Sequence, residues 1–231
     1  MKQLKRLIQK MLRQINIAVT DLDNFQLHFN PGPLDLLAKY KVSCKSILHI
    51  GGHYAEEAEI YDKAGVDRAV FIEGDPKVFE IMQQKLNAFP KFHGICTLLS
   101  NGNSEIDFNI ASNEGASSSI LRPGRHLEKK PNVVFNETTR LQSIRLDSMN
   151  LGPFDLIVID VQGAELLVIE GGFETIIQAQ ALWIELNAGS MYEGDADSSQ
   201  IVTALKDYFV PVYMNMGANL WGDGLFIRKN R

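Results

Sequence analysis

The stretch Phe154–Glu165, FDLIVIDVQGAE, decides the fold. Its first part, Phe154–Asp160, is a compact apolar run bounded by acidic residues, which is typical of a central parallel strand buried on both faces. A helical pattern begins at Gly163 and ends at Gly171-Gly172. This order of strand, glycine turn and helix predicts one unit of a parallel α/β sheet.

The same unit recurs on both sides of this stretch. Further strands are predicted at 46–50, 68–73, 92–100, 105–110 and 181–186, and helices at 55–64, from Pro76 and from Ser198. Asp75 is expected to cap the helix from Pro76, Ser198 is expected to cap its own helix, and Gly65 is expected to end the helix before it. Strands at 211–214 and 225–228 suit a terminal hairpin. The pattern predicts an α/β fold with a parallel sheet and helices on both faces.

Composition narrows the function. The chain has 231 residues and a net charge of −5, without the basic footprint that a nucleic-acid binder needs. No apolar run is long enough to span a bilayer. Cys44 and Cys96 lie among apolar neighbours and are expected to be buried free thiols in a reducing compartment. These features favour a cytoplasmic location.

The N-terminal residues form a separate segment. An apolar stripe at helical spacing and a polar face of lysine and arginine predict an amphipathic helix over residues 1–15. Two interpretations stay open: the stripe packs on the domain or a second subunit, or the basic helix lies on an anionic membrane surface or a partner. Asn30-Pro31-Gly32-Pro33 breaks the chain, and Pro33 suits the first turn of a short helix. We therefore divide the chain into an N-terminal helix and linker, 1–30, and a main domain, 31–231.

Candidate binding residues follow the first two strands of the main domain. In parallel sheets, ligands bind at the carboxyl ends of the strands. Gly51, Gly52 and His53 follow the first strand, and these glycines are expected to let the backbone approach a ligand. Glu73 ends the second strand at the spacing of a ribose-binding carboxylate. The G-x-G-x-x-G fingerprint of a dinucleotide site is absent, which disfavours a nicotinamide-dependent oxidoreductase.

Further acidic residues follow the next strands. Asp160 leaves the most buried strand, and Glu165 lies in the first turn of the following helix, where both can also act as helix-capping charges. Glu185 lies on the strand after that. Asp160 and Glu185 suit either a divalent cation with waters or the charged end of a substrate or cofactor. Two carboxylates make a poor dedicated metal site, so we predict no metal.

Together these pieces resemble one family, the FkbM-type S-adenosylmethionine-dependent methyltransferases, over roughly residues 34–228. The most specific part, Asp155–Glu165 followed by Val168–Gly172, is similar to the family's signature of an acidic strand end, a glycine turn and a glycine-terminated helix. Weaker similarities are found at Ile47–Glu57, Phe71–Pro76, the G-x-S-S loop Gly115–Ser119, Arg145–Ser148 and Trp183–Glu185.

The resemblance implies a Rossmann-like class I methyltransferase fold with a mostly parallel seven-stranded sheet and a C-terminal antiparallel hairpin. It also implies S-adenosylmethionine as cofactor and O-methylation of a sugar, a glycan or a natural-product-like small molecule. The expected cofactor-binding residues are Gly51, Gly52, His53, Glu73, Ser100 and Asp160. The expected substrate-binding residues are Ser118, Ser119, Glu165 and Glu185.

A general base must take the proton of the acceptor hydroxyl. Asp160 is the first candidate and His53 the second, and fixing the cofactor is the alternative role for each. The loop 113–140 is expected to cover the site, and its Arg122, Arg125, His126 and Arg140 either bind an acidic or sugar substrate or are solvated.

Two positions depart from the family's first motif. His49 occupies the place of an acid that in related enzymes helps to hold the cofactor's amino group, and Ala55 occupies the place of a glycine. A non-catalytic relative with an interaction role therefore stays open as an alternative.

Overall fold

The computed structural model describes residues 17–19, 27–29, 31–217 and 221–229. The chain divides into two compact units, Met1–Ser43 and Cys44–Arg231. In the first unit, β1 (Ile17–Val19) pairs antiparallel with β2 (Leu27–Phe29), and α2 spans Pro33–Lys39. Pro33 lies in the first turn of α2, as predicted. The predicted helix over 1–15 lies outside the described residues, and the domain boundary at residue 30 stays a prediction.

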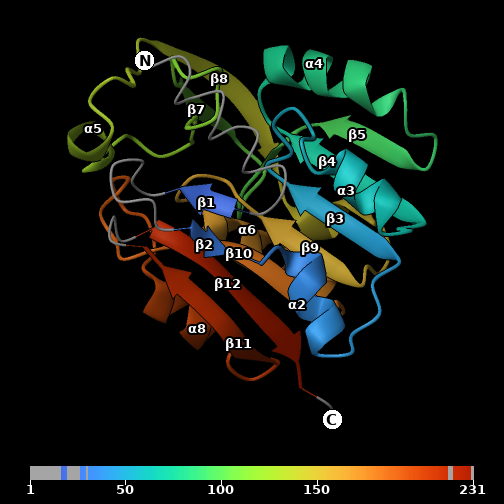
Figure 1. The fold of residues 1–231 in the computed structure, drawn as a ribbon. Helices are drawn as coiled ribbons and strands as arrows, with labels where there is room; N and C mark the ends of the chain where they lie inside the picture. The colour runs from blue at the N-terminus through green and yellow to red at the C-terminus, as the bar shows by residue number, and fades with distance from the viewer. Residues whose placement is uncertain (1–16, 20–26, 30, 218–220, 230–231) are drawn as a thin grey trace. The chain divides into compact units, whose positions relative to one another are not determined.

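The second unit alternates strands and helices (Figure 1). Its strands are β3 (Ser46–Ile50), β4 (Arg68–Glu73), β5 (Phe92–Cys96), β6 (Leu98–Leu99), β7 (Glu105–Ile110), β8 (Glu137–Ile144), β9 (Leu156–Ile159), β10 (Ala181–Asn187), β11 (Phe209–Met216) and β12 (Trp221–Arg228). Its helices are α3 (Ala58–Lys63), α4 (Pro76–Leu86), α5 (His126–Lys129), α6 (Glu165–Gly171), α7 (Phe173–Ile176) and α8 (Ser198–Leu205), with a 3₁₀ turn at Leu146–Met149.

Seven strands form the main sheet, in the order β11-β12-β10-β9-β3-β4-β5. The run from β10 to β5 is parallel throughout, whereas β12 is antiparallel to both of its neighbours. The predicted class is confirmed: an α/β fold with a mostly parallel seven-stranded sheet and a C-terminal antiparallel hairpin. The order of strands reverses between β3 and β9, so the carboxyl ends of these two strands flank a crevice where ligands bind in such sheets.

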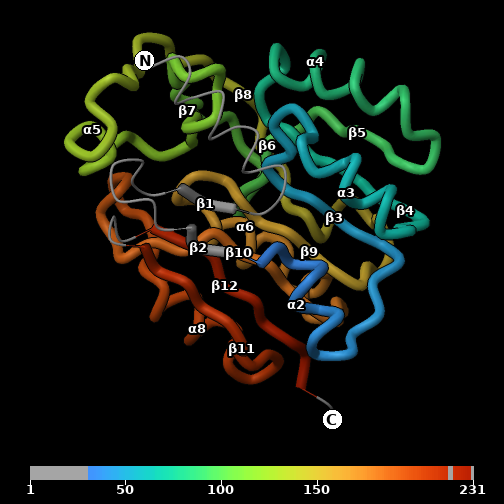
Figure 2. Tube along the Cα trace, viewed as in Figure 1, coloured from blue at the N-terminus to red at the C-terminus, as the bar shows by residue number. Residues whose placement is uncertain are grey.

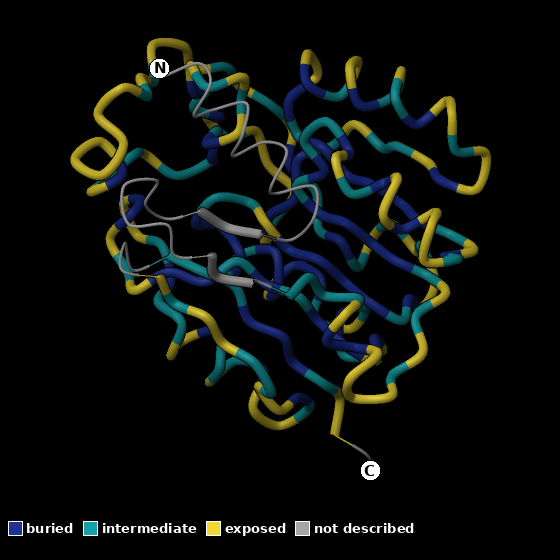
Figure 3. The backbone as a smooth tube through the Cα atoms, in the orientation of Figure 1, coloured by how far each residue is buried: buried dark blue, intermediate teal, exposed yellow. Residues whose placement is uncertain are grey.

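Helices cover both faces of the sheet, as predicted. One face packs against α6, α7 and α8 through a continuous apolar cluster that includes Ile157 of β9, Val168 of α6 and Ile201 of α8. On the other face, the ring of Phe71 in β4 stacks 5.9 Å from that of Tyr61 in α3, and α4 packs against β4 and β5. The central strands β3, β4, β9 and β10 are accordingly mostly buried (Figure 3).

Both strands of the terminal hairpin are longer than predicted, and three other predicted boundaries were wrong for an identifiable physical reason. The strand expected over 92–100 leaves the main sheet after Cys96, because Leu98–Leu99 pairs with β8 instead. The helix expected from residue 55 starts at Ala58, since Ala55 has a φ of +51° that a right-handed helix cannot contain. The cap of α8 is Asp197 rather than Ser198, because the Asp197 carboxylate accepts the amide hydrogens of the first turn.

A second, three-stranded sheet adjoins the segment 113–140, which was expected to be a loop. Its order is β6-β8-β7, and β8 begins at Glu137 inside that segment. The arrowheads of β3 and β9 point toward the segment that carries β7 and α5 (Figure 1), and the chain trace in Figure 2 follows this segment from β7 through α5 to β8. Hydrogen bonds described below hold it over the ends of the main strands.

Two smaller expectations have clear outcomes. Cys44 and Cys96 are free thiols, but neither is buried as expected: Cys44 is half-buried, and Cys96 is exposed because it ends the outermost strand, β5. Among the helices of the described residues, none has the length and apolar character needed to cross a membrane.

Candidate active site

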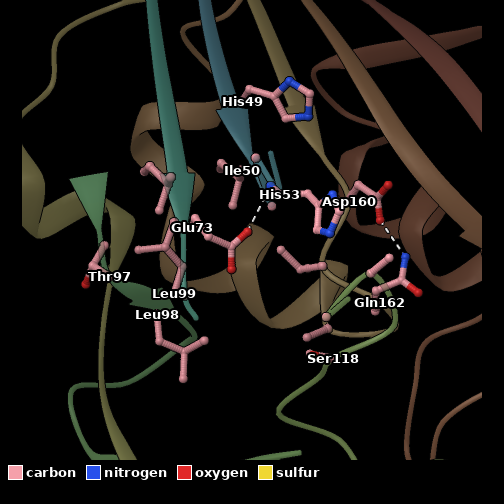
Figure 4. Close-up of a pocket in the computed structure, with 18 of the residues that line it drawn as sticks. His49, Ile50, His53, Glu73, Thr97, Leu98, Leu99, Ser118, Asp160 and Gln162 are labelled. Carbon is pink, nitrogen blue, oxygen red and sulfur yellow. Dashed lines mark hydrogen bonds between the residues drawn. The ribbon is translucent and has the colours of Figure 1, made fainter. Parts of the chain in front are cut away.

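A cavity of about 240 Å³ lies at the carboxyl ends of β3, β4 and β9 (Figure 4). Its walls are residues 49–53, 56, 57, 72–74, 97–99, 108, 115, 116, 118, 120, 160–162 and 164. The predicted residues Gly51, Gly52, His53, Glu73 and Asp160 therefore meet in one place, as the rule for parallel sheets leads one to expect.

The backbone amides of the loop after β3 are hydrogen-bonded to residues of β4. The amides of Gly51 and Gly52 both donate to the Ile72 carbonyl at 2.9 Å, and the His53 amide donates to Glu73 Oε2 at 2.9 Å. A phosphate-binding loop needs free amides at this position, aimed at the ligand. These three amides are already paired within the protein, so they are not available to a pyrophosphate.

The two glycines are required by the protein itself. Gly51 has a φ of +83°, and a Cβ at this position would lie 1.7 Å from the Asp160 carbonyl oxygen of the neighbouring strand end. A Cβ on Gly52 would lie 2.9 Å from the sulfur of Met82. We expected these glycines to let the backbone approach a ligand, but the close approach that demands them is to β9 and α4.

Glu73 is held rigidly inside the cavity. Its Oε2 accepts the His53 amide, and its Oε1 accepts the Asp75 amide at 2.8 Å. Burial raises the pKa of this carboxyl above its ordinary value, against the lowering effect of the two amide hydrogen bonds. Each oxygen keeps a lone pair, so the side chain can still accept hydrogen bonds from hydroxyl groups of a ligand.

His53 connects the loop after β3 to residues 113–140, called the covering segment below. Its Nδ1 lies 2.9 Å from Glu56 Oε1, and its Nε2 lies 2.9 Å from the Glu114 carbonyl oxygen. Burial lowers the pKa of the imidazole, but these two acceptors outweigh burial, and the net pKa is raised above 6.5. Because both nitrogens face acceptors, the ring is stabilised as a double donor. This arrangement argues against His53 as the general base and for a role in closing the cavity.

Asp160 is exposed at the end of β9 and tethered by Gln162. The Gln162 amide nitrogen donates to Asp160 Oδ1 at 2.7 Å (Figure 4). It also donates to Glu185 Oε2 at 2.9 Å. The Tyr192 hydroxyl lies 2.9 Å from the Ser117 carbonyl oxygen and 3.2 Å from the Gln162 side-chain oxygen, so these two acceptors share its one hydrogen. The sequence did not single out Gln162 as a site residue, although its φ of +55° marks a specialised position.

Three carboxylates gather beside the cavity. Asp160, Glu165 and Glu185 each place one oxygen within 4.8 Å of the others. Burial and, to a lesser extent, the charge of Asp160 raise the pKa of Glu165 to about 7 and that of Glu185 well above its ordinary value. Backbone and side-chain donors are directed at these oxygens, including the amides of Val161 and Gly163 at 3.1 Å from Glu165. The protein's own donors therefore offset part of the negative charge, and the absence of a metal stays a prediction.

The predicted serines have different positions. Ser118 lines the cavity and accepts the Ala111 amide through Oγ at 3.0 Å. Ser119 donates through Oγ to the Gln162 carbonyl at 2.8 Å, so it anchors the covering segment without lining the cavity. Ser100 is not among the lining residues; its carbonyl lies where a Cβ on Gly171 would be. The chain instead contributes residues 97–99 at this wall, because it leaves the main sheet after β5.

Two arginines of the covering segment lie near acidic side chains, and its histidine is buried. Arg125 lies 3.9 Å from Glu128, and Arg140 lies 3.6 Å from Asp107. His126 is fully buried against the rings of Phe135, Tyr192 and Trp221. Burial lowers the pKa of His126 to about 4. The substrate-binding role considered for this group stays a prediction, and its histidine is part of an aromatic cluster.

The charge lining the cavity is predominantly acidic. It carries the carboxylates of Glu56, Glu57, Glu73 and Asp160, whereas no lysine or arginine of the described residues lines it. Glu56 and Glu57 were not among the predicted site residues. The signal available in the sequence was this pair of acidic residues directly after a glycine loop. It was missed because the helix was expected to begin at residue 55, before the pair.

Comparisons with known proteins agree with this geometry. A sequence model described as the methyltransferase FkbM domain matches residues 48–209. The chain is 28% identical over 173 residues to the 2-O-methyltransferase NoeI of Sinorhizobium fredii, an alignment that covers 70% of this chain and 71% of that protein.

Solved structures resemble the fold. A methyltransferase FkbM from Methylobacillus flagellatus aligns with a TM-score of 0.52 at 12% identity, over 80% of this chain and 43% of that chain. The chain thus spans less than half of that protein. A ribosomal-protein methylase from Lactobacillus delbrueckii subsp. bulgaricus aligns with a TM-score of 0.50 at 13% identity, over 84% of this chain and 75% of that chain.

Proposed function

The chain belongs to the FkbM methyltransferase family, and from this premise we propose that it transfers the methyl group of S-adenosylmethionine to a hydroxyl group of a sugar, a glycan or a similar small natural product. The named activity of the similar S. fredii protein, 2-O-methylation, supports oxygen as the accepting atom. The family match alone leaves the acceptor open.

The proposal rests mainly on one observation: the cavity is acidic, and the amides of the loop after β3 are already hydrogen-bonded within the protein. S-Adenosylmethionine carries an ammonium and a sulfonium cation against a single carboxylate and has no phosphate. A cavity with four carboxylates and no lysine or arginine among its described lining residues complements such a ligand. A nicotinamide dinucleotide has an anionic pyrophosphate, which needs the free amides that this loop lacks.

The residues present fit this cofactor. Glu73 would accept the ribose hydroxyls through the lone pairs that its two amide partners leave open. The apolar side chains of Ile72, Leu98 and Phe108 line the cavity next to it and suit the flat base. His53 would close the cavity by joining the loop after β3 to the covering segment, which keeps water from the reacting atoms.

The cofactor supplies an activated methyl group, and the chain's own residues must align and deprotonate the acceptor. The hydroxyl of the acceptor would have to lose its proton when its oxygen is methylated. Asp160 would receive this proton. Only its Oδ1 is hydrogen-bonded, to Gln162, within the described part of the chain, so Oδ2 is free to accept.

Calorimetry with S-adenosylmethionine, S-adenosylhomocysteine and NAD tests the cofactor. We expect micromolar binding of the first two and none of NAD. Binding of NAD alone would point to an oxidoreductase, and binding of none of the three would support a non-catalytic relative.

Methyl transfer is then measured with labelled cofactor against a panel of sugars, glycans and hydroxylated metabolites. With an accepted substrate, Asp160→Asn should lower the rate by roughly 10²- to 10⁴-fold, the usual contribution of a general base. It should leave the affinity for S-adenosylhomocysteine within a few-fold. An unchanged rate would remove Asp160 from the role of base.

A further inference from the structure

The four carboxylates of the cavity differ in how many hydrogen bonds they already make. Glu73 accepts two backbone amides, and Asp160 accepts the Gln162 amide. Glu56 accepts from the His53 ring and from the Tyr54 amide at 3.2 Å. The remaining carboxylate, that of Glu57, makes no hydrogen bond among the described residues, so both of its oxygens are available to a ligand.

The backbone places Glu57 at the cavity through an unusual turn. His53 and Ala55, neither of them glycine, have φ values of +43° and +51°. Such conformations cost free energy, and in folded proteins they cluster at functional sites. Glu57 directly precedes the first residue of α3, yet its side chain makes no capping hydrogen bond there. Its carboxylate is therefore not held by the backbone amides of the first turn of the helix.

The neighbour of Glu57 is the histidine that replaces an acid. His49 Nδ1 lies 4.0 Å from Glu57 Oε2. The imidazole itself is 5% exposed, stacks on Phe71 at 5.3 Å, and shares Nδ1 with the Tyr61 hydroxyl at 3.1 Å. An imidazole has no anionic oxygens, so His49 cannot bind a cation as a carboxylate at this position would. The negative charge at this end of the cavity comes instead from Glu57.

We propose that Glu57 binds the ammonium group at the amino-acid end of the cofactor, in place of the acid that is absent at position 49. This inference rests on the proposed function, because it needs a ligand with an aminocarboxylate end. Glu73 and Glu57 then divide the cofactor between them: Glu73 serves the nucleoside, and Glu57 serves the amino acid.

Two ligands separate this inference from the proposed function. S-Adenosylhomocysteine has both the nucleoside and the amino-acid end, whereas 5′-methylthioadenosine has the nucleoside and the sulfur but no ammonium. Calorimetry with both ligands compares the wild-type protein with Glu57→Gln, which keeps the size of the side chain and removes its charge. Because the Glu57 side chain is 42% exposed, this substitution leaves the fold intact.

We expect Glu57→Gln to weaken S-adenosylhomocysteine binding about 5- to 20-fold, the range for losing one partly exposed charge-assisted hydrogen bond. Glu57→Lys should weaken it further, because it places a cation next to the ammonium group. Both variants should leave the affinity for 5′-methylthioadenosine within twofold. The matched control is Glu59→Gln in α3, whose carboxylate pairs with Lys63 at 2.7 Å away from the cavity; it should change neither affinity.

The possible results distinguish a failure of the proposed function from a failure of the role proposed for Glu57. If the wild-type protein binds neither ligand, the proposed function fails, and this inference fails with it. If the wild type binds both ligands and Glu57→Gln leaves both affinities unchanged, the inference alone is wrong. An equal loss for both ligands also overturns it, since Glu57 would then shape the cavity rather than recognise the ammonium group. A selective loss for S-adenosylhomocysteine in Asp160→Asn but not in Glu57→Gln would assign the contact to Asp160 instead.

Discussion

Replacing Glu165 by glutamine should make the stability of the protein less dependent on pH. Glu165 begins α6 with only 3% of its surface exposed, and its Oε1 accepts the amides of Val161 and Gly163. Burial raises its pKa from 4.5 to about 7, and repulsion from Asp160 adds to the rise, against the lowering effect of the amides. The folded protein therefore holds a proton on Glu165 at pH values where the unfolded chain has lost it.

The sign of the effect follows from this difference. Below pH 4.5 the carboxyl is protonated in both states, so the folded state carries no cost for a buried charge. As the pH rises from 4.5 to about 7, the unfolded state loses its proton first, and the free energy of unfolding falls. The full difference corresponds to roughly 3 kcal/mol, because one pKa unit is worth about 1.4 kcal/mol. The loss is complete above the folded pKa.

Urea unfolding at pH 5 and at pH 8 measures this contribution. Between the two values, the wild-type protein should lose about 2–3 kcal/mol more than Glu165→Gln, whose amide oxygen still accepts the two backbone amides but does not ionise. Glu170→Gln is the control, because Glu170 is an exposed carboxylate of the same helix, and it should follow the wild type within about 0.5 kcal/mol. Identical pH dependence in the wild type and Glu165→Gln would show that folding does not change the pKa of the Glu165 carboxyl.

Two further substitutions test the backbone and the cavity. Gly65→Ala should destabilise the protein by about 1–2 kcal/mol in urea unfolding, because Gly65 has a φ of +73°. The control is Gly102→Ala, where an added Cβ meets nothing within 4 Å; its free energy of unfolding should stay within about 0.5 kcal/mol of the wild-type value. Equal effects would mean that conformation does not decide the cost. Glu73→Ala should weaken S-adenosylhomocysteine and 5′-methylthioadenosine alike, by about 10-fold or more in calorimetry, because both have the ribose; unchanged affinities would end the ribose role of Glu73.

Local signals in the sequence were sufficient for the first half of the main sheet. The bounds of β3 and β4 match the predicted strands, since each is an apolar run that ends at a glycine or an acid. The start of α4 was also predictable, because Asp75 accepts the Lys77 amide and Pro76 occupies the first helical position. In these places, propensity and packing favour the same structure.

Tertiary partners decided the elements that the sequence did not predict. The apolar run after Phe92 continues beyond Cys96, but residues 98 and 99 pair with β8, and no local signal separates the two sheets. β8 itself is mostly polar and partly exposed, and it exists because β7 and β6 pair with its two edges. Ser100 was placed in the site by an overlong third strand, so the error in the site came from the error in the fold.

The site shows the same division. The strand-end rule correctly brought Gly51, Glu73 and Asp160 together, because it depends only on the direction of parallel strands. It did not reveal which backbone donors remain free, since the amides of the loop find their acceptor on β4, about twenty residues further along the chain. Pairing of these amides is what distinguishes a cavity for a cationic cofactor from one for a pyrophosphate.

The two departures from the family's first motif therefore have different consequences. Ala55 adopts a φ of +51°, the conformation that a glycine would take freely, so the turn is preserved at a modest cost in free energy. His49 changes the chemistry instead, because a buried imidazole bonded to Tyr61 replaces an anionic oxygen. The preserved turn leaves Glu57 beside that imidazole with both oxygens available. A loop that keeps its shape can move one contact to a neighbouring side chain, and for this reason the replacement at position 49 is compatible with cofactor binding.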